Sequence, residues 1–150
     1  MVMKPTCLAL HRDERGAALV EMALTLPLML LVSAGIFEFG RAYQTWQVLT
    51  NAAREGARIA VLPGTTDANI TNRVRTYISD GQLSGAATTP VMIDHTATIP
   101  VGIGTSSATR VTVNYPFTFV VLQPMAQLIN PQSETGAPLT MTVSALMRNE

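Results

Sequence analysis

The sequence predicts an α+β protein that combines one long N-terminal helix with a small three-stranded antiparallel sheet and a short helix. An apolar run at residues 17–37 contains a single ionisable side chain, Glu21. A heptad-like stripe of apolar and small residues continues the helical pattern over residues 41–62. Farther on, three runs rich in β-branched and aromatic residues are typical of strands. The first two observations predict the long helix, and the third predicts the sheet.

The length and charge of the chain limit the number of domains it can hold and the classes of protein to which it can belong. At 150 residues, the chain holds one compact domain plus a helix or a tail. Ten lysines and arginines balance ten aspartates and glutamates, so the basic surface that nucleic-acid binding needs is not expected. Only 13% of the residues are charged and 47% are hydrophobic, which favours a membrane segment or an assembly surface. We expect no nucleic-acid partner.

The apolar run at residues 17–37 is long enough to cross a membrane once. As a helix it would be about 31 Å long, which matches the hydrocarbon thickness of a bilayer. Lys4, Arg12 and Arg15 precede the run and favour a cytoplasmic N-terminus, with the rest of the chain outside. The sequence therefore predicts a transmembrane helix over residues 17–40.

Three interpretations of the N-terminus imply different mature proteins. A secretory signal peptide would be cut before Gly35, although its apolar core would be unusually long. An uncleaved anchor would leave Glu21 one turn inside the membrane, within reach of the interface. In the third interpretation, residues 1–16 are a cytoplasmic leader that is cut after Gly16, where a residue without a Cβ can leave the helix. That cut would create an amine on Ala17, four residues from Glu21 and on the same helical face.

Residues 41–62 are predicted to continue the helix as a stem that ends at Pro63 and Gly64. Small side chains on the stem would let another backbone approach closely. The sequence leaves two covers open for this face, the chain's own following domain or another subunit, and the charges of the stem are available for pairing in both cases. The residues of this predicted helix-packing face are Ala52, Ala53, Gly56, Ala57, Ala60, Arg54 and Arg58.

Residues 63–150 are predicted to form an extracytoplasmic α+β head. Ile70, Val74 and Ile78 recur at helical spacing and predict a short amphipathic helix over residues 67–79. Strands are expected at residues 91–99, 109–121 and 139–147, with a turn-rich connection at 100–108 and a loop with one helical turn at 122–138. Pro116 lacks an N–H group, so the second strand should be an edge strand or bulged there.

The residues of the head do not suggest an enzyme. If the chain is cut after Gly16, Cys7 and His11 leave with the leader, and His95 is the one remaining histidine. His95 follows Asp94 directly, and neighbouring strand residues point to opposite faces of a sheet. No catalytic residues, metal ligands or cofactors are expected, nor is a small-molecule substrate.

Three distinctive segments follow one another in the first sixty residues: Arg15-Gly16-Ala17-Ala18-Leu19-Val20-Glu21, Gly35-Ile36-Phe37-Glu38-Phe39-Gly40-Arg41, and Ala52-Ala53-Arg54-Glu55-Gly56-Ala57-Arg58. In this order they resemble the TadE-like family of tight-adherence pilus proteins. Ordinary type IV pilins frequently carry phenylalanine where this chain has Ala17.

The resemblance implies a pilin-like fold and a role as a pseudopilin or minor pilin. A prepilin peptidase would cut between Gly16 and Ala17. The partners would be other pilins and pseudopilins of a tight-adherence secretion system, and the product an adhesive Flp-type fibre. Glu21 would set the register by pairing with the amine of a neighbouring subunit. The protein would reside in the bacterial inner membrane, with or without incorporation into the fibre. The alternative is a single-pass anchored binding module unrelated to pili.

Overall fold

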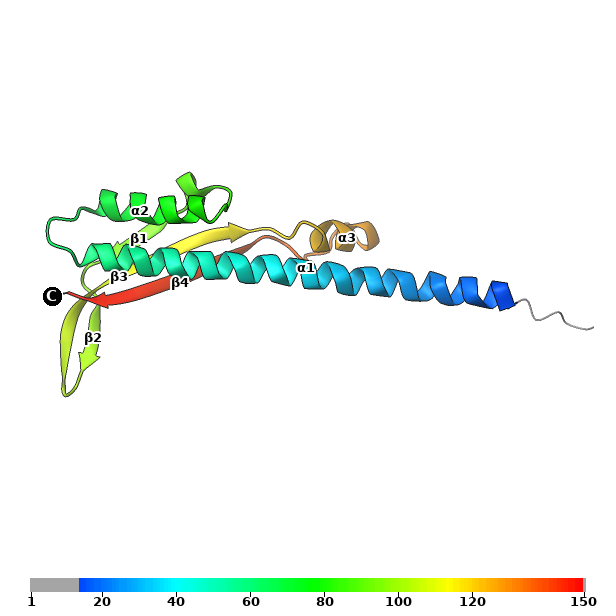
Figure 1. The fold of residues 1–150 in the computed structure, drawn as a ribbon, viewed down its shortest axis with the longest axis horizontal. Helices are drawn as coiled ribbons and strands as arrows, with labels where there is room; N and C mark the ends of the chain where they lie inside the picture. Colours follow the sequence, from blue (N-terminus) through cyan, green and yellow to red (C-terminus); the bar gives the residue numbers. More distant parts are fainter. Residues whose placement is uncertain (1–13, 150) are drawn as a thin grey trace, which may run out of the picture. The chain divides into compact units, whose positions relative to one another are not determined.

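The computed structural model describes residues 14–149 (Figure 1) and confirms the α+β class. Helices and strands mix along the chain, and a long apolar helix comes first. In order, the elements are α1 (Glu14–Ala60), α2 (Asp67–Asp80), the 3₁₀ helix η1 (Ala86–Thr88), β1 (Val91–Asp94), β2 (Thr98–Val101), β3 (Gly104–Phe117), α3 (Leu122–Ile129) and β4 (Leu139–Arg148).

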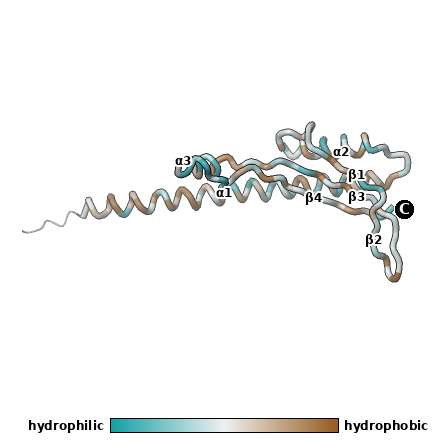
Figure 2. Tube along the Cα trace, turned by 180° about the vertical axis from the view of Figure 1, so that it is seen from behind, coloured by the Kyte–Doolittle hydropathy of each residue, from teal (hydrophilic) through white to brown (hydrophobic). Residues whose placement is uncertain are grey.

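The chain divides into two compact units, one ending at Ile36 and the other beginning at Phe37. The first unit is helical from Glu14, and its large apolar side chains are exposed. Hydrophobic residues recur along it in Figure 2, and the helix is long and apolar enough to span a membrane. The hydroxyls of Thr25 and Ser33 donate to the carbonyl oxygens of Glu21 and Met29, at 2.9 and 2.8 Å. These bonds satisfy polar groups inside the apolar run, where water would be absent in a bilayer.

The second unit is organised around β3, which pairs antiparallel with the other three strands. Its C-terminal part pairs with β4 from Ala108↔Arg148 to Phe117↔Leu139. β1 pairs with β3 from Val91↔Val113 to Asp94↔Arg110, and β2 pairs from Thr98↔Ser107 to Val101↔Gly104. Within the described residues the sheet therefore has four strands, and the expectation of three is wrong.

The extra strand arises because the run expected over residues 91–99 is broken by a turn. The Asp94 carboxylate accepts hydrogen bonds from the Thr96 backbone N–H at 2.9 Å and from the Thr96 hydroxyl at 2.6 Å. Such a local side-chain bond competes with strand pairing and turns the chain. The second half then forms β2 and pairs with residues that were expected in a connection, through a hairpin in which Gly102 has a φ of 60°.

Pro116 lies in the strand that pairs with all the others, so β3 as a whole is not an edge strand. At this residue, however, β3 has a paired neighbour on one side only, as expected for an edge, and its register with β4 continues without a bulge. The pairing with β1 ends at Val113, and beyond that residue β4 is the neighbour that pairs with β3, including Pro116 with Thr140. A proline is tolerated here because one side of β3 is free of a ladder at this position.

The two short helices differ in how well the sequence predicted them. α2 begins where expected, with the Thr66 hydroxyl accepting from the Asn69 backbone N–H, and it buries Ile70, Val74 and Ile78. Eight residues of the expected loop instead form α3, which is longer than the single turn predicted. The head thus has a second short helix that local sequence patterns underestimated.

One hydrophobic core joins the stem to the sheet and to α2. α1 contributes Leu49 and three alanines, α2 its three buried aliphatic side chains, and β3 and β4 their inward-facing residues. The fully buried members are Leu49, Ala52, Ala53, Ala57, Ile70, Val74, Ile78, Val111 and Val113. Residues 41–62 and 63–149 therefore pack as parts of one compact unit, because the stem supplies one wall of the core.

Candidate functional site

The small-residue face of the stem lies against the chain's own α2 and sheet. Ala52, Ala53 and Ala57 are fully buried there. A Cβ on Gly56 would lie 2.5 Å from Val74 Cγ2 and 3.2 Å from Val111 Cγ1, so α2 and β3 both approach this position closely. These four residues are covered within the chain, which leaves them unavailable to another subunit in this arrangement.

The other members of this face lie at its margins. Ala60 is half-buried and packs against the core, whereas Arg54 is exposed. Arg58 is exposed as well, but its guanidinium makes two bonds to Glu55, Nε to Oε2 at 3.0 Å and Nη2 to Oε1 at 2.9 Å. Both arginines of the predicted face therefore reach solvent, and Arg58 is held by Glu55 as well.

Glu55 links the stem to α2 through a second arginine. Arg73 on α2 donates to Glu55 Oε1 through Nη2 at 3.0 Å and through Nε at 3.2 Å. The hydrogen bonds from Arg58 and then from Arg73 lower the pKa of the Glu55 carboxyl to about 2, against the opposing effect of burial. The sequence alone shows that Arg58 is near Glu55 on the helix, but it does not bring Arg73 to the same carboxylate.

We expect the head to lose stability in acid through Glu55. Its pKa is lower in the folded chain than the ordinary 4.5, so its contribution is complete above about pH 4.5 and is lost as the pH falls toward 2. Glu55→Gln should cost about 1–2 kcal/mol at pH 7 and less at pH 3. Pulse proteolysis of the full chain in detergent micelles, with urea as denaturant, measures this difference.

The matched control for Glu55 is Glu134→Gln, which changes an exposed carboxylate in a loop. This substitution should leave the unfolding midpoint unchanged at both pH values. A Glu55→Gln variant whose midpoint follows that of the wild type at every pH would show that the two arginines contribute no net stability.

A second charged cluster surrounds Glu38, close to the start of the second unit. Its side chain is 1% exposed, and Oε1 accepts from the backbone N–H of Val120, at 2.6 Å, and from that of Val121. These amides belong to the two residues just before α3, where the N–H groups at a helix start lack partners within the helix. A carboxylate at this position both accepts their bonds and complements the helix dipole. Glu38 therefore caps α3 from a distant part of the sequence.

Arg41 compensates the charge of Glu38. Its Nη1 lies 2.8 Å from Glu38 Oε2, and both terminal nitrogens donate to the Thr118 carbonyl oxygen at 3.5 Å. The guanidinium also stacks over the Phe117 ring, 5.2 Å from its centre. The buried carboxylate is thus paired and hydrogen-bonded, as a buried charge must be. The sequence shows Glu38 between Gly35 and Arg41, but it does not show that the carboxylate meets the amides of Val120 and Val121, 82 and 83 residues farther along the chain.

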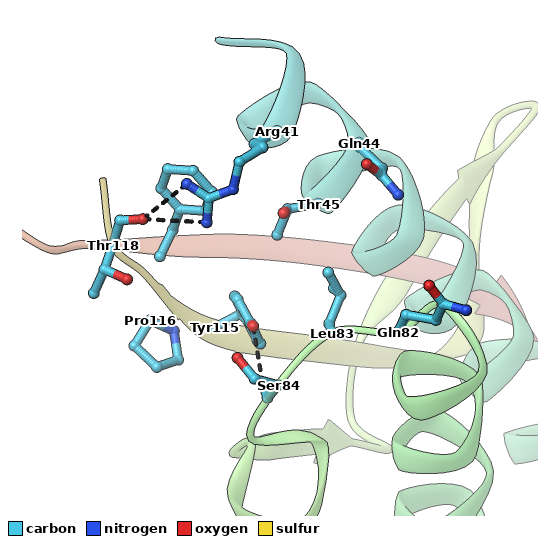
Figure 3. Close-up of a pocket in the computed structure, with 11 residues that line it drawn as sticks. Arg41, Gln44, Thr45, Gln82, Leu83, Ser84, Tyr115, Pro116 and Thr118 are labelled. Carbon is cyan, nitrogen blue, oxygen red and sulfur yellow. Dashed lines mark hydrogen bonds between the residues drawn. The ribbon is translucent and has the colours of Figure 1, made fainter. Parts of the chain in front are cut away.

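Arg41 also lines the pocket in Figure 3, between α1, the segment after α2, and the end of β3. The pocket has a volume of about 270 Å³, and Arg41 is the charged residue in its lining. Tyr115 closes one side, where its hydroxyl donates to the Ser84 carbonyl oxygen at 2.9 Å. This volume is smaller than that of usual small-molecule sites, and the charge of Arg41 is directed to Glu38. The size and lining of the pocket therefore do not indicate a ligand-binding site.

His95 contacts α2 and β3. Its Nε2 lies 2.8 Å from Asp67 Oδ1, and its Nδ1 lies 3.3 Å from the hydroxyl of Thr109. This order of carboxylate, imidazole and hydroxyl resembles a catalytic triad, but Thr109 is only 1% exposed and its hydroxyl donates to Asn149 Oδ1 at 2.9 Å. A nucleophile that substrate cannot reach does not make an active site. The contacts instead hold the turn after β1 against the start of α2.

The residues predicted for processing and register lie near the start of α1. Gly16 is in the helix and half-buried, while Ala17 and Glu21 are exposed and share one helical face. Most of the predicted leader, including Cys7 and His11, lies outside the described residues. The structure therefore places an acidic side chain and the position of the expected new amine one turn apart.

A model of the TadE-like protein family matches residues 16–58 and confirms the resemblance over this segment. The match begins at Gly16 and includes Ala17, Glu21, the apolar run and the stem through Arg58. It covers less than a third of the chain, and it leaves out α2 and all the strands. No curated protein and no solved structure matches the chain.

Proposed function

We propose that this chain, whose residues 16–58 match the TadE-like family, is a pseudopilin or minor pilin that acts in assembling a tight-adherence, Flp-type pilus. The match is the observation that carries the proposal. The apolar N-terminal helix supports it, since a pilin subunit must be held in a membrane before it joins a fibre. In this proposal the work of the protein is assembly, and it needs no catalytic residue.

The proposed route begins with cleavage by a prepilin peptidase after Gly16 on the cytoplasmic side of the inner membrane. The basic residues before the apolar run support that orientation. The cut frees the amine of Ala17, and Glu21 then pairs with the amine of a neighbouring subunit in the low-dielectric bilayer. Such a pair would fix how far one helix is displaced along the next, because each unpaired charge there is costly.

The burial of the stem's small-residue face restricts which surfaces can meet other subunits. Gly56 and the alanines around it serve the chain's own core. We therefore assign subunit contacts to the exposed apolar side chains of the first unit and to Arg54 on the outer side of the stem. The head would then lie on the extracytoplasmic side of the membrane.

The test is the mature N-terminus of the full chain, recovered from membranes of cells with and without a prepilin peptidase. Intact mass and N-terminal sequencing should show a terminus at Ala17 only when the peptidase is present. Glu21→Ala should be cut at the same position but should fail to co-purify with the partner pilins. A terminus at Gly35, or an intact Met1 in both strains, would reject the pilin route and favour the anchored binding module.

A further inference from the structure

We infer that α3 and the aromatic side chains at the start of the second unit form a second membrane contact, lying in the lipid headgroup layer on the outer side of the bilayer. The inference rests on the membrane anchorage in the proposed function. It goes further because it assigns a surface of the head, and not only the apolar helix, to the membrane.

In the fold, the start of α3 lies beside Glu38 of α1. Glu38 is the first ionisable residue after Glu21, so it stands immediately beyond the apolar run at residues 17–37. Its carboxylate accepts from the backbone N–H groups of Val120 and Val121, which immediately precede α3. If the run crosses the bilayer, α3 begins where the chain leaves the hydrocarbon. Figure 1 shows the β2–β3 hairpin at the opposite end of the second unit.

The chemistry of α3 fits an apolar boundary better than water. Residues 111–133, which include the whole helix, contain no Asp, Glu, Lys, Arg or His. Leu128 is 86% exposed and Val120 is 58% exposed. Exposed apolar side chains without neighbouring charges are typical of a surface that another apolar phase covers. Helices that lie in the interface bury such side chains about 5–10 Å into the boundary of headgroups and acyl chains.

The aromatic residues of α1 near the start of the second unit also indicate a position in the headgroup layer. Phe37, Phe39, Tyr43 and Trp46 are all exposed. Phe39 and Tyr43 lie within about 9 Å of Phe37 along the helix axis. Tyrosine and tryptophan are enriched where a span leaves a bilayer, since one end of each ring system is apolar and the other is polar.

The arrangement of these rings favours lipid over a second protein subunit as the cover. At 100° per residue, Phe37 points nearly opposite to Phe39, and the head attaches between them through buried Glu38. A bilayer covers both flanks of the helix together. One docked helix would cover one flank and leave the other aromatic side chain in water.

The experiment measures depth with single tryptophans in the full chain, reconstituted in phosphatidylethanolamine and phosphatidylglycerol vesicles that contain brominated lipids. Trp46 is the one native tryptophan and reports directly. In a Trp46→Phe background, Leu128→Trp reports α3, Leu24→Trp reports the apolar run, and Ile103→Trp reports the hairpin tip. All three positions are exposed, so the substitutions should not disturb packing.

We expect lipids brominated close to the headgroup to reduce the fluorescence of Trp46 and of Leu128→Trp. Leu24→Trp should respond to deeper bromines, and Ile103→Trp should not respond. Quenching of Leu24→Trp without quenching of Leu128→Trp would overturn the inference and leave the anchorage intact. Absence of quenching at Leu24→Trp would reject the anchorage itself, and the inference with it. Equal quenching at Ile103→Trp and Leu128→Trp would indicate adsorption of the whole head and would also overturn the inference.

Discussion

Gly56→Val is expected to destabilise the head by about 3 kcal/mol, the upper part of the usual range for overpacking a core. The new Cβ would lie 2.5 Å from Val74 Cγ2 and 3.2 Å from Val111 Cγ1. Both neighbours are buried and β-branched, so neither can rotate away easily. α2 and the sheet would have to move from α1 together. Pulse proteolysis of the full chain in detergent micelles should show a much lower urea midpoint.

Gly40→Val is the matched control, because it introduces the same side chain on the same helix where the added Cβ meets no atom within 4 Å beyond its adjacent residues and the local helix backbone. Valine is a slightly better helix former than glycine, so this variant should be as stable as the wild type or more stable by about 0.5 kcal/mol. A second variant, Gly56→Val with Val74→Ala, should recover part of the loss by removing the nearest clash. If Gly56→Val and Gly40→Val behave alike, the contact of α1 with α2 is looser than the structure indicates.

Glu38→Ala is expected to cost about 3 kcal/mol, since it removes one partner of a buried charge pair and the acceptor for two backbone N–H groups. Val120 and Val121 would lose their partner, and Arg41 would keep only its long bonds to Thr118 and its contact with Phe117. Hydrogen exchange should accelerate at residues 120–125 more than in the strands. The urea midpoint of the full chain should fall as well.

Glu38→Gln distinguishes the contribution of the hydrogen bonds from that of the negative charge. The glutamine carbonyl oxygen can still accept from the amides just before α3, while the pair with Arg41 is lost. Exchange at residues 120 and 121 should therefore lie between that of the wild type and that of Glu38→Ala. If Glu38→Ala leaves exchange in α3 unchanged, the carboxylate does not cap this helix, and the position of α3 in the membrane proposal loses its support.

Local patterns were sufficient for the elements whose energetics are local. The apolar run, the start of α2 at residue 67 and the buried positions Ile70, Val74 and Ile78 follow from hydropathy and spacing. Strand number was missed because a turn centred on the Asp94 carboxylate divides one β-rich run into two strands. Residue composition does not reveal that one side-chain hydrogen bond outweighs the strand preference of the residues around it.

The residues of the candidate site also divide into those that local sequence identifies and those that only the fold brings together. Gly16, Ala17 and Glu21 could be selected from the sequence because their proposed chemistry depends on spacing along one helix. Arg73 and the partners of Glu38 could not, because these contacts join residues 18 to 83 positions apart. Nothing in the local sequence around Val120 indicates that its N–H will meet a carboxylate from the first helix.

A membrane-length apolar helix, a stem with one smooth side and a β-rich head can all be read from the order of the residues. Hydropathy and periodicity depend on residues a few positions apart, so they identify which side chains share a face. What covers that face depends on the folded arrangement of the chain. The smooth side around Gly56 meets the chain's own α2 and β3, and Glu38 meets α3, because packing and burial select partners by their proximity in space and not along the chain.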